Sequence, residues 1–178
     1  MTDELRSRMV AALPRLRRFA YALTGNAEMG DDLVQETCLR ALSRIDRWQP
    51  GTRLESWLYR IAQNIWLDRV RAVKVRGEVV DMEVVNALPG TDGREEMDRQ
   101  VTLEAVDAAL NQLPHEQRAI VALVCIEGLS YKEAADITGV PIGTVMSRLA
   151  RARQMLHAIL DAPAPARKAR ATIVKTGT

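Results

Sequence analysis

The chain is poor in aromatic residues and cysteine, and it has no long apolar run. Only 4% of its 178 residues are aromatic, which favours small helical domains over a β-sandwich or barrel. No segment approaches the ~20 uninterrupted apolar residues of a membrane span, and Asp3 and Glu4 precede any apolar run, unlike in a secretory signal. Cys38 and Cys125 lie far apart in apolar helical patterns, so we expect buried, reduced thiols. These features indicate a cytoplasmic protein.

The side chains that carry enzyme chemistry are also scarce. His115 and His157 are the only histidines, and neither stands beside a nucleophile or a group of metal ligands. No Gly-rich motif for phosphate binding occurs. We therefore expect no catalytic residue, no metal site and no cofactor.

Charge is abundant but unevenly distributed, although the net charge is only +2. Residues 1–76 hold 14 basic and 9 acidic side chains, and residues 77–100 hold 2 and 7. Residues 101–160 are nearly balanced, with 5 and 6, and residues 161–178 hold 4 and 1. The pattern predicts two domains, 1–76 and 101–160, joined by an acidic linker and followed by a basic tail.

The linker and the tail also differ in composition from the rest. Residues 77–100 have no sustained helical period and contain the turn signals Pro89-Gly90 and Asp92-Gly93. A stretch of this length is unusual inside one compact domain. Residues 161–178 are rich in Pro, Ala, Lys and Arg, and we expect them to be disordered.

Helical periodicity dominates the first domain. Residues 3–24 repeat apolar residues at three-to-four spacing, with Pro14 marking a kink or a second helix start. A second helix begins at Asn26, or at Asp31 after a turn, and a third follows the loop at Pro50-Gly51. The residues that these two helices should bury are Leu33, Val34, Thr37, Cys38, Ala41, Leu42 and Ile45, and then Leu54, Leu58, Ile61, Ile65 and Val70.

The second domain contains a helix-turn-helix pattern between Leu129 and Leu156. Ser130 can cap the first helix, with Glu133 as its reciprocal partner. Gly139 suits the left-handed residue that ends such a helix, and the turn precedes a second helix. The pattern is typical of proteins that place a helix in a groove of DNA.

The second helix of this pattern has one basic and one apolar side. Ile142, Val145 and Leu149 should face inward. Between Val140 and Leu156 the charged residues are three arginines and no acid, whereas a merely solvated helix usually mixes signs. A solvated helical hairpin nevertheless remains an alternative. The polar residues on the other faces are Thr144, Ser147, Arg148, Arg151 and Arg153.

Aromatic and arginine residues alternate between positions 47 and 71. Aromatic faces stack on unpaired bases, at about 1–3 kcal/mol per base, and arginines contact phosphates, so this segment could hold a melted strand. A small bundle also needs core residues, and we expect at least one of Trp57 and Trp66 to be buried. The residues concerned are Trp48, Trp57, Tyr59 and Trp66 with Arg47, Arg53, Arg60, Arg69 and Arg71.

Three segments in order resemble motifs of the extracytoplasmic-function (ECF) sigma factors, over roughly residues 10–160. They are DDLVQETCLRAL, GTRLESWLYRIAQNIWLDRVR and LPHEQRAIVALVCIEGLSYKEAADITGVPIGTVMSRLARAR. The resemblance implies an all-α protein with a sigma region 2 bundle and a sigma region 4 helix-turn-helix. It also implies core RNA polymerase and promoter DNA as partners, an anti-sigma factor as regulator, and no membrane insertion of its own.

The resemblance assigns roles to three groups of residues. Met146 stands where many relatives carry a basic or polar residue, so an apolar contact replaces the expected hydrogen bond. By their chemistry, Ser147 and Arg148 suit base edges, while Thr144, Arg151 and Arg153 suit phosphates. The implied sites are Asp31, Asp32, Gln35, Glu36 and Arg40 for polymerase; Arg47, Trp48, Arg53, Trp57, Arg60 and Asn64 for the −10 element; and Thr144, Met146, Ser147, Arg148, Arg151 and Arg153 for the −35 element.

Two other function classes compete with this interpretation. A stand-alone helix-turn-helix regulator would explain the second domain, but it leaves the aromatic and arginine residues of the first without a role. An enzyme is disfavoured by the scarcity of catalytic side chains. We therefore expect an alternative sigma factor that opens promoters with no chemistry of its own.

Overall fold

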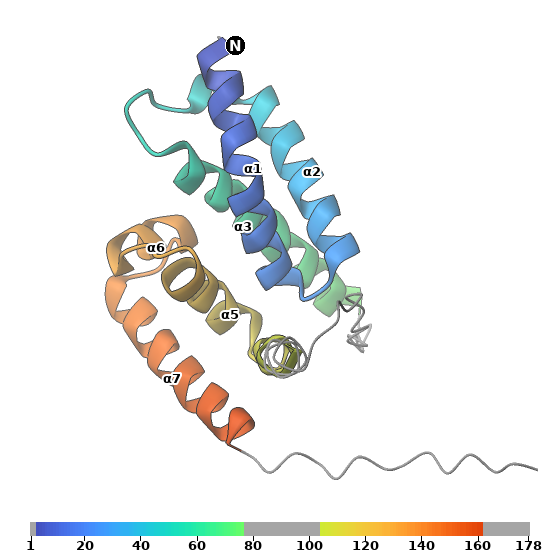
Figure 1. Cartoon of the computed structure of the whole chain (residues 1–178), viewed down its shortest axis with the longest axis vertical. Helices are drawn as coiled ribbons and strands as arrows, with labels where there is room; N and C mark the ends of the chain where they lie inside the picture. The colour runs from blue at the N-terminus through green and yellow to red at the C-terminus, as the bar shows by residue number, and fades with distance from the viewer. Residues whose placement is uncertain (1–2, 77–103, 162–178) are drawn as a thin grey trace, which may run out of the picture.

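The computed structural model describes residues 3–76 and 104–161, and these residues form helices connected by short loops. The first three helices make one bundle and the later ones a second unit (Figure 1). Within the described ranges there is no strand. The elements are α1 (Asp3–Thr24), α2 (Ala27–Ser43), the 3₁₀ turn η1 (Ile45–Arg47), α3 (Leu54–Arg76), a helix over 104–111, α5 (His115–Val121), the π-helical turn η2 (Ala122–Ile126), α6 (Tyr131–Thr138) and α7 (Ile142–Leu160).

The first bundle packs the apolar faces of α1, α2 and α3 against one another. α1 ends where predicted, before Gly25, which has a positive φ of 67°. The Asn26 side chain then accepts a hydrogen bond from the Met29 amide and caps α2, which decides between the two predicted starts. α1 continues through Pro14, so a second helix start there was wrong. Pro14 is exposed, and water can reach the carbonyl that its missing N–H leaves unbonded.

Most residues predicted for the core of this bundle are buried or half-buried. The fully covered side chains include Leu33, Leu54, Leu58 and Ile65. Leu42 was predicted to be buried but is exposed. The buried stripe of α2 ends on Ala41, and the next residue lies about 100° further round the helix, on its outer side.

The second unit places α6 and α7 as the predicted helix-turn-helix. The Ser130 hydroxyl accepts a hydrogen bond from the Glu133 amide, and the Glu133 carboxylate accepts one from the Ser130 amide at 2.9 Å. Gly139 has the predicted left-handed conformation, with φ 70°. Val145 and Leu149 are buried as predicted.

Predictions about burial were wrong at two positions of this unit. Ile142 is 45% exposed. It is the first residue of α7, and its side chain points back along the helix toward the turn instead of over the core. Cys125 is exposed and Cys38 half-buried, and both thiols are free. Cys125 lies in the π-helical turn, where the wider winding moves it off the apolar face of the preceding helix.

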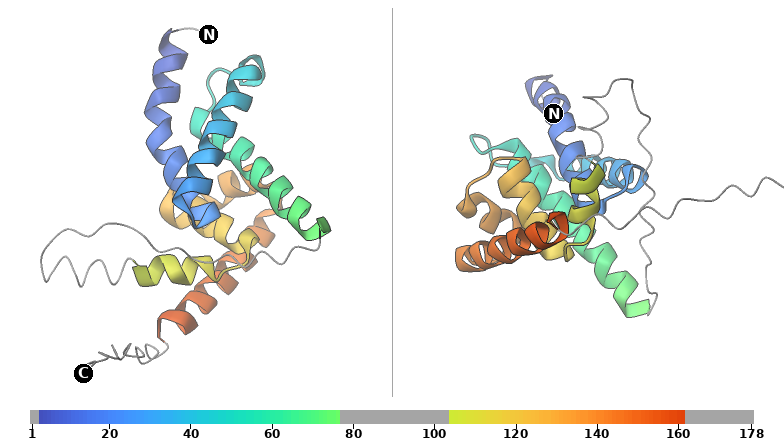
Figure 2. Two further views of the ribbon diagram at one scale, coloured as in Figure 1. Left: turned by 90° about the vertical axis from the view of Figure 1, so that its right-hand side faces the viewer. Right: turned by 60° about the horizontal axis from the view of Figure 1, so that its bottom comes forward.

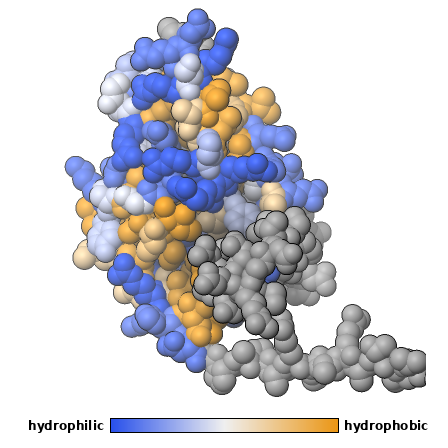
Figure 3. Space-filling view, in the orientation of Figure 1, coloured by the Kyte–Doolittle hydropathy of each residue, from blue (hydrophilic) through white to orange (hydrophobic). Residues whose placement is uncertain are grey.

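The two units pack against each other. α1 contacts α5 and η2, and α3 contacts α6, so α6 lies beside the first part of α3 in all three ribbon views (Figure 2). A single cluster of buried apolar residues continues from α1 into α5, α6 and α7. Polar residues predominate on the face in Figure 3, and apolar residues reach the surface there in patches.

Some predictions lie outside the described residues. These concern the linker over 77–100 and the tail after Asp161. In the part of the chain that the structure describes, no helix is long and apolar enough to cross a membrane.

Candidate nucleic-acid and polymerase interfaces

The six −35 candidates all lie on α7, but they are not equally accessible. Met146, Ser147, Arg151 and Arg153 are exposed, whereas Thr144 and Arg148 are half-buried. The Ser147 hydroxyl donates to the Thr144 carbonyl at 3.1 Å, a bond that DNA can replace without rearranging the helix. α7 itself carries no acidic residue over its length. Its exposed surface therefore carries basic and polar side chains suited to phosphates and base edges, with Met146 as an apolar residue among them.

Arg148 has a neighbour that the sequence did not suggest. Its Nη2 lies 3.4 Å from Oε2 of Glu116 on α5, and its side chain is only 23% exposed. His115 Nε2 lies 3.9 Å from the other oxygen of that carboxylate. Burial is the main cause that lowers the pKa of His115, so this imidazole is neutral at pH 7. The Arg148 side chain is thus largely covered, and its guanidinium lies beside an exposed acid of its own unit.

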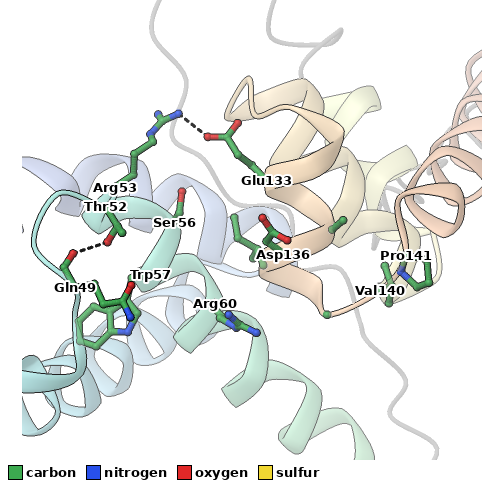
Figure 4. Close-up of a pocket in the computed structure, with 13 residues that line it drawn as sticks. Gln49, Thr52, Arg53, Ser56, Trp57, Arg60, Glu133, Asp136, Val140 and Pro141 are labelled. Carbon is green, nitrogen blue, oxygen red and sulfur yellow. Dashed lines mark hydrogen bonds and ion pairs between the residues drawn. The ribbon is translucent and has the colours of Figure 1, made fainter.

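Three of the six −10 candidates line one groove. Arg53, Trp57 and Arg60 face it from the start of α3, together with Gln49, Thr52 and Ser56 (Figure 4). The groove has a volume of about 860 Å³, and its opposite wall is α6 and the turn after it. The Ser56 hydroxyl is buried there without a hydrogen-bond partner. On the α3 side, an aromatic ring, an unpaired hydroxyl and two arginines are a suitable set for an unstacked base and its phosphates, whereas the α6 side contributes the carboxylates of Glu133 and Asp136.

The other three −10 candidates lie outside this groove. Arg47 and Asn64 are exposed, and Trp48 is half-buried. Arg8 of α1 stacks over the Trp48 ring, with its guanidinium carbon 5.0 Å from the ring centroid. Trp66 is buried and Trp57 is half-buried, which confirms that at least one of the pair belongs to the core.

The polymerase candidates on α2 divide into exposed and paired residues. Asp32 and Gln35 are exposed. Asp31 accepts two hydrogen bonds of 2.7 Å from Arg17 of α1. Glu36 binds Arg40 and also Arg69 of α3, each at 2.6 Å. The hydrogen bond from Arg69 is the main cause that lowers the pKa of Glu36. Glu36 therefore joins α2 to α3 in addition to any role at a partner surface.

Sequence reasoning missed Leu39, which is 69% exposed on α2. It follows Asp32 and Gln35 at the helical spacing i, i+3 and i+7, so the three share one face. That spacing was a usable signal.

Sequence reasoning also missed two acidic residues of the second unit. Glu127 is buried against α1 and α3, and Glu133 binds Arg53 Nη1 at 2.9 Å across the groove (Figure 4). Glu133 was predicted only as a capping residue, and Glu127 had no assigned role. No group of three His, Cys, Asp or Glu side chains that could hold a metal ion occurs among the described residues.

Comparison with known proteins identifies both units. Residues 9–75 match the model of Sigma-70 region 2, and residues 103–156 match that of Sigma-70, region 4. The ECF RNA polymerase sigma factor EcfG of Rhodopseudomonas palustris strain TIE-1 is 42% identical over 160 residues, covering 90% of this chain and 87% of the relative. The chain belongs to the ECF family of RNA polymerase sigma factors.

Other relatives of this ECF sigma factor agree with that result. SigW of Bacillus subtilis strain 168 is 31% identical, with 80% of this chain and 81% of the relative covered. Among solved structures, the sigma factor RpoE in complex with the anti-sigma factor NepR from Bartonella quintana has a TM-score of 0.77 at 32% identity. The alignment covers 90% of this chain and 99% of that one. CnrH in complex with the cytosolic domain of CnrY has a TM-score of 0.61 at 27% identity, with 89% and 86% covered.

Family membership confirms the predicted fold class and the predicted function. The chain is an all-α alternative sigma factor, and its general partners are core RNA polymerase and promoter DNA. The roles of individual residues are a separate matter and stay predictions.

Proposed function

We propose that this sigma factor uses three separate surfaces in transcription initiation. The exposed face of α2 around Asp32, Gln35 and Leu39 binds core RNA polymerase. The start of α3 receives the non-template strand of the −10 element, and α7 lies in the major groove of the −35 element. The observation that carries the proposal is the grouping of Arg53, Trp57 and Arg60 at the start of α3, because a stand-alone duplex-binding regulator has no use for a single-strand site.

The division into domains belongs to the same proposal. Region 2 occupies residues 1–76 and region 4 occupies residues 101–160, with residues 77–100 as the linker and 161–178 as a tail. Two compact units with their own helices support this division. The protein acts in the cytoplasm, where core polymerase works, and it supplies binding energy and geometry without catalysing a reaction itself.

An anti-sigma factor is the proposed regulator. The similar sigma factor from Bartonella quintana was solved with the anti-sigma factor NepR, and CnrH was solved with the cytosolic domain of CnrY. Both similarities extend over nearly the whole of this chain. A partner that contacts both regions at once would keep them from reaching polymerase and DNA.

Permanganate footprinting tests the function directly. The purified protein is added to core RNA polymerase and candidate promoter DNA, and unpaired thymines are mapped. We expect reactive thymines at the −10 element only when both proteins are present. The Arg60→Ala variant should lower their reactivity at least several-fold, because Arg60 lines the groove. The exposed α1 variant Arg6→Ala serves as the control and should leave reactivity unchanged.

If no thymine becomes reactive at any candidate promoter while the protein alone binds duplex DNA tightly, the chain works as a stand-alone regulator.

A further inference from the structure

Trp48 lies at the junction between η1 and the loop that leads to the −10 candidates of α3. Its amide donates to the Ile45 carbonyl at 3.1 Å, the last hydrogen bond of η1. Its side chain is half-buried and packs against the apolar core of the first bundle. The backbone and the ring of Trp48 are therefore both attached to the bundle at the point where the chain turns toward α3.

A tight turn connects Trp48 with α3. The Thr52 amide donates to the Gln49 carbonyl at 3.2 Å, and the Thr52 hydroxyl donates to the same oxygen at 2.7 Å (Figure 4). Pro50 fixes its own φ, and Gly51 has the positive φ of 91° that a type II turn needs at its third residue. Because these restraints make the turn stiff, a displacement of Trp48 also displaces Gln49 and Thr52, which line the groove at the start of α3.

The Trp48 ring has few restraints of its own. Its Nε1 is buried without a hydrogen-bond partner among the described residues. The ring is held by packing against the core and by Arg8 of α1, whose guanidinium carbon lies 5.0 Å from the ring centroid, within the range of a cation–π contact. Because Arg8 occupies this face of the ring, a base can stack there only if Arg8 leaves. The arrangement suits an anchor better than a platform for bases.

Arg8 has no competing partner in the described part of the chain. Other arginines of α1 form ion pairs, such as Arg6 with Asp3 and Arg17 with Asp31, whereas no described acid lies within ion-pair distance of Arg8. Its side chain is exposed and does not line the groove at the start of α3. Any influence of Arg8 on that groove within the protein therefore passes through the Trp48 ring.

We propose that Arg8 is a positioning residue for the −10 site and acts through Trp48. Its guanidinium holds the ring in place, and the ring holds the turn that leads into α3. Without this contact the turn samples more conformations, and a strand binds only the ordered fraction, so its apparent affinity falls by that fraction. The inference rests on the proposed function for the identity of the strand.

Fluorine NMR tests the contact without polymerase or DNA. The chain contains three tryptophans, and 5-fluorotryptophan gives each a signal that a Trp→Phe variant assigns. Arg8→Ala should shift the Trp48 signal and leave those of Trp57 and Trp66 in place. The exposed variant Arg6→Ala removes the same charge from the same helix and should shift none of the three. An unchanged Trp48 signal in Arg8→Ala overturns the proposal.

A double-mutant cycle tests whether Arg8 acts through Trp48. The holoenzyme is titrated with a fluorescent single strand carrying the −10 element of a promoter that it opens. Arg8→Ala should weaken binding about two- to five-fold, the range of a cation–π contact at an exposed site. In a Trp48→Leu background, which removes the aromatic face, Arg8→Ala should have no further effect. Arg6→Ala should leave the affinity unchanged.

The salt dependence distinguishes positioning from direct contact with DNA. A residue that acts through Trp48 leaves the salt slope of strand binding unchanged, whereas loss of one phosphate contact lowers it by about 0.7. A lower slope in Arg8→Ala, or the same loss of affinity with and without Trp48, overturns the proposal and makes Arg8 a DNA contact. Holoenzyme binding to a duplex with only the −35 element should not change in Arg8→Ala, because α7 is far from this contact in sequence and fold.

Two further outcomes keep this proposal separate from the proposed function. If the holoenzyme opens no promoter, the proposed function fails, and the fluorine signals still decide whether Arg8 holds Trp48. If Trp48→Leu loses helical circular dichroism, Trp48→Phe takes its place in the cycle. The smaller ring should then reduce the effect of Arg8→Ala, and an undiminished effect overturns the proposal.

Discussion

At the scale of single residues, the arginines of α7 differ in how accessible their guanidinium groups are to DNA. Arg151 and Arg153 are exposed and can contact phosphates at once. Arg148 is held near Glu116 and is largely covered. A fixed guanidinium loses little conformational entropy when it meets a base, which suits a residue that reads sequence. This difference in exposure is the basis for the proposal that Arg148 reads bases while Arg151 and Arg153 contact phosphates.

We expect Arg148→Ala to relax −35 preference more than it lowers overall affinity. A good bidentate contact to guanine contributes about 1–3 kcal/mol of discrimination against the wrong base. The measurement compares binding of the holoenzyme to the native promoter and to single −35 substitutions at several salt concentrations. The salt slope should hardly change.

Arg153→Ala provides the matched comparison on the same helix. It should weaken binding uniformly across promoters and reduce the salt slope by about 1. The same uniform weakening in Arg148→Ala, with a reduced slope, would make Arg148 a phosphate contact. An unchanged preference in that variant would remove it from the interface.

At the scale of elements, the turn between α6 and α7 was well predicted because its signals are local. The capping box needs only Ser130 and Glu133, and the left-handed end of α6 needs only Gly139. Burial was predicted less well. Whether Ile142 or Cys125 is covered depends on where the helix ends and on a π-helical turn. Neither feature has a periodic signature in the sequence.

The turn between α6 and α7 predicts opposite changes in protein stability when alanine replaces two of its glycines. Gly139→Ala should destabilise the protein by about 1–2 kcal/mol, because φ is 70° and an L-residue is strained there. Gly143→Ala lies inside α7 and should stabilise it by about 0.5–1 kcal/mol. An added Cβ meets no atom within 4 Å at either site, so the backbone conformation alone sets the difference. Chemical denaturation of both variants measures it.

Equal changes in stability for Gly139→Ala and Gly143→Ala would contradict the explanation by backbone conformation. Loss of stability at Gly143 would mean that the start of α7 is not helical in solution. A gain at Gly139 would mean that α6 does not end in a left-handed residue.

At the scale of the whole molecule, the sequence predicts two helical units but does not predict how they pack. The donors to Glu127 lie 68 to 112 residues away from it along the chain, and no local pattern connects an acid at the end of α5 and η2 with arginines in α1. The predicted acidic linker suggested independent domains. The interface that joins them consists of side chains that also look ordinary for exposed helix faces.

Acidification tests the interface between the two units. The shifted pKa values of its acids predict whether the interface weakens or strengthens as the pH falls. The pKa of Glu127 in the folded protein lies below its ordinary value of 4.5, so its charge stabilises docking at neutral pH. That stabilisation begins to fall near pH 4.5 and is lost as pH drops through the folded-state pKa. The pKa of Glu133 is lowered mainly by the Ser130 amide inside its own unit, and only its smaller contribution from Arg53 acts across the interface. Asp107 opposes both, because burial raises its pKa.

With spin labels at the exposed positions Val10→Cys of α1 and His157→Cys of α7, in a Cys38→Ser, Cys125→Ser background, we expect a narrow distance distribution at pH 7. It should broaden and lengthen as the pH falls below about 4.5, before helical circular dichroism is lost. Glu127→Gln should already be open at pH 7 and show little further change. Glu104→Gln should follow the native curve. If the native distances and the helical signal change together, acid unfolds the regions instead of separating them, and the hydrogen bonds of Glu127 with Arg15, Arg18 and Tyr59 do not control how the regions pack.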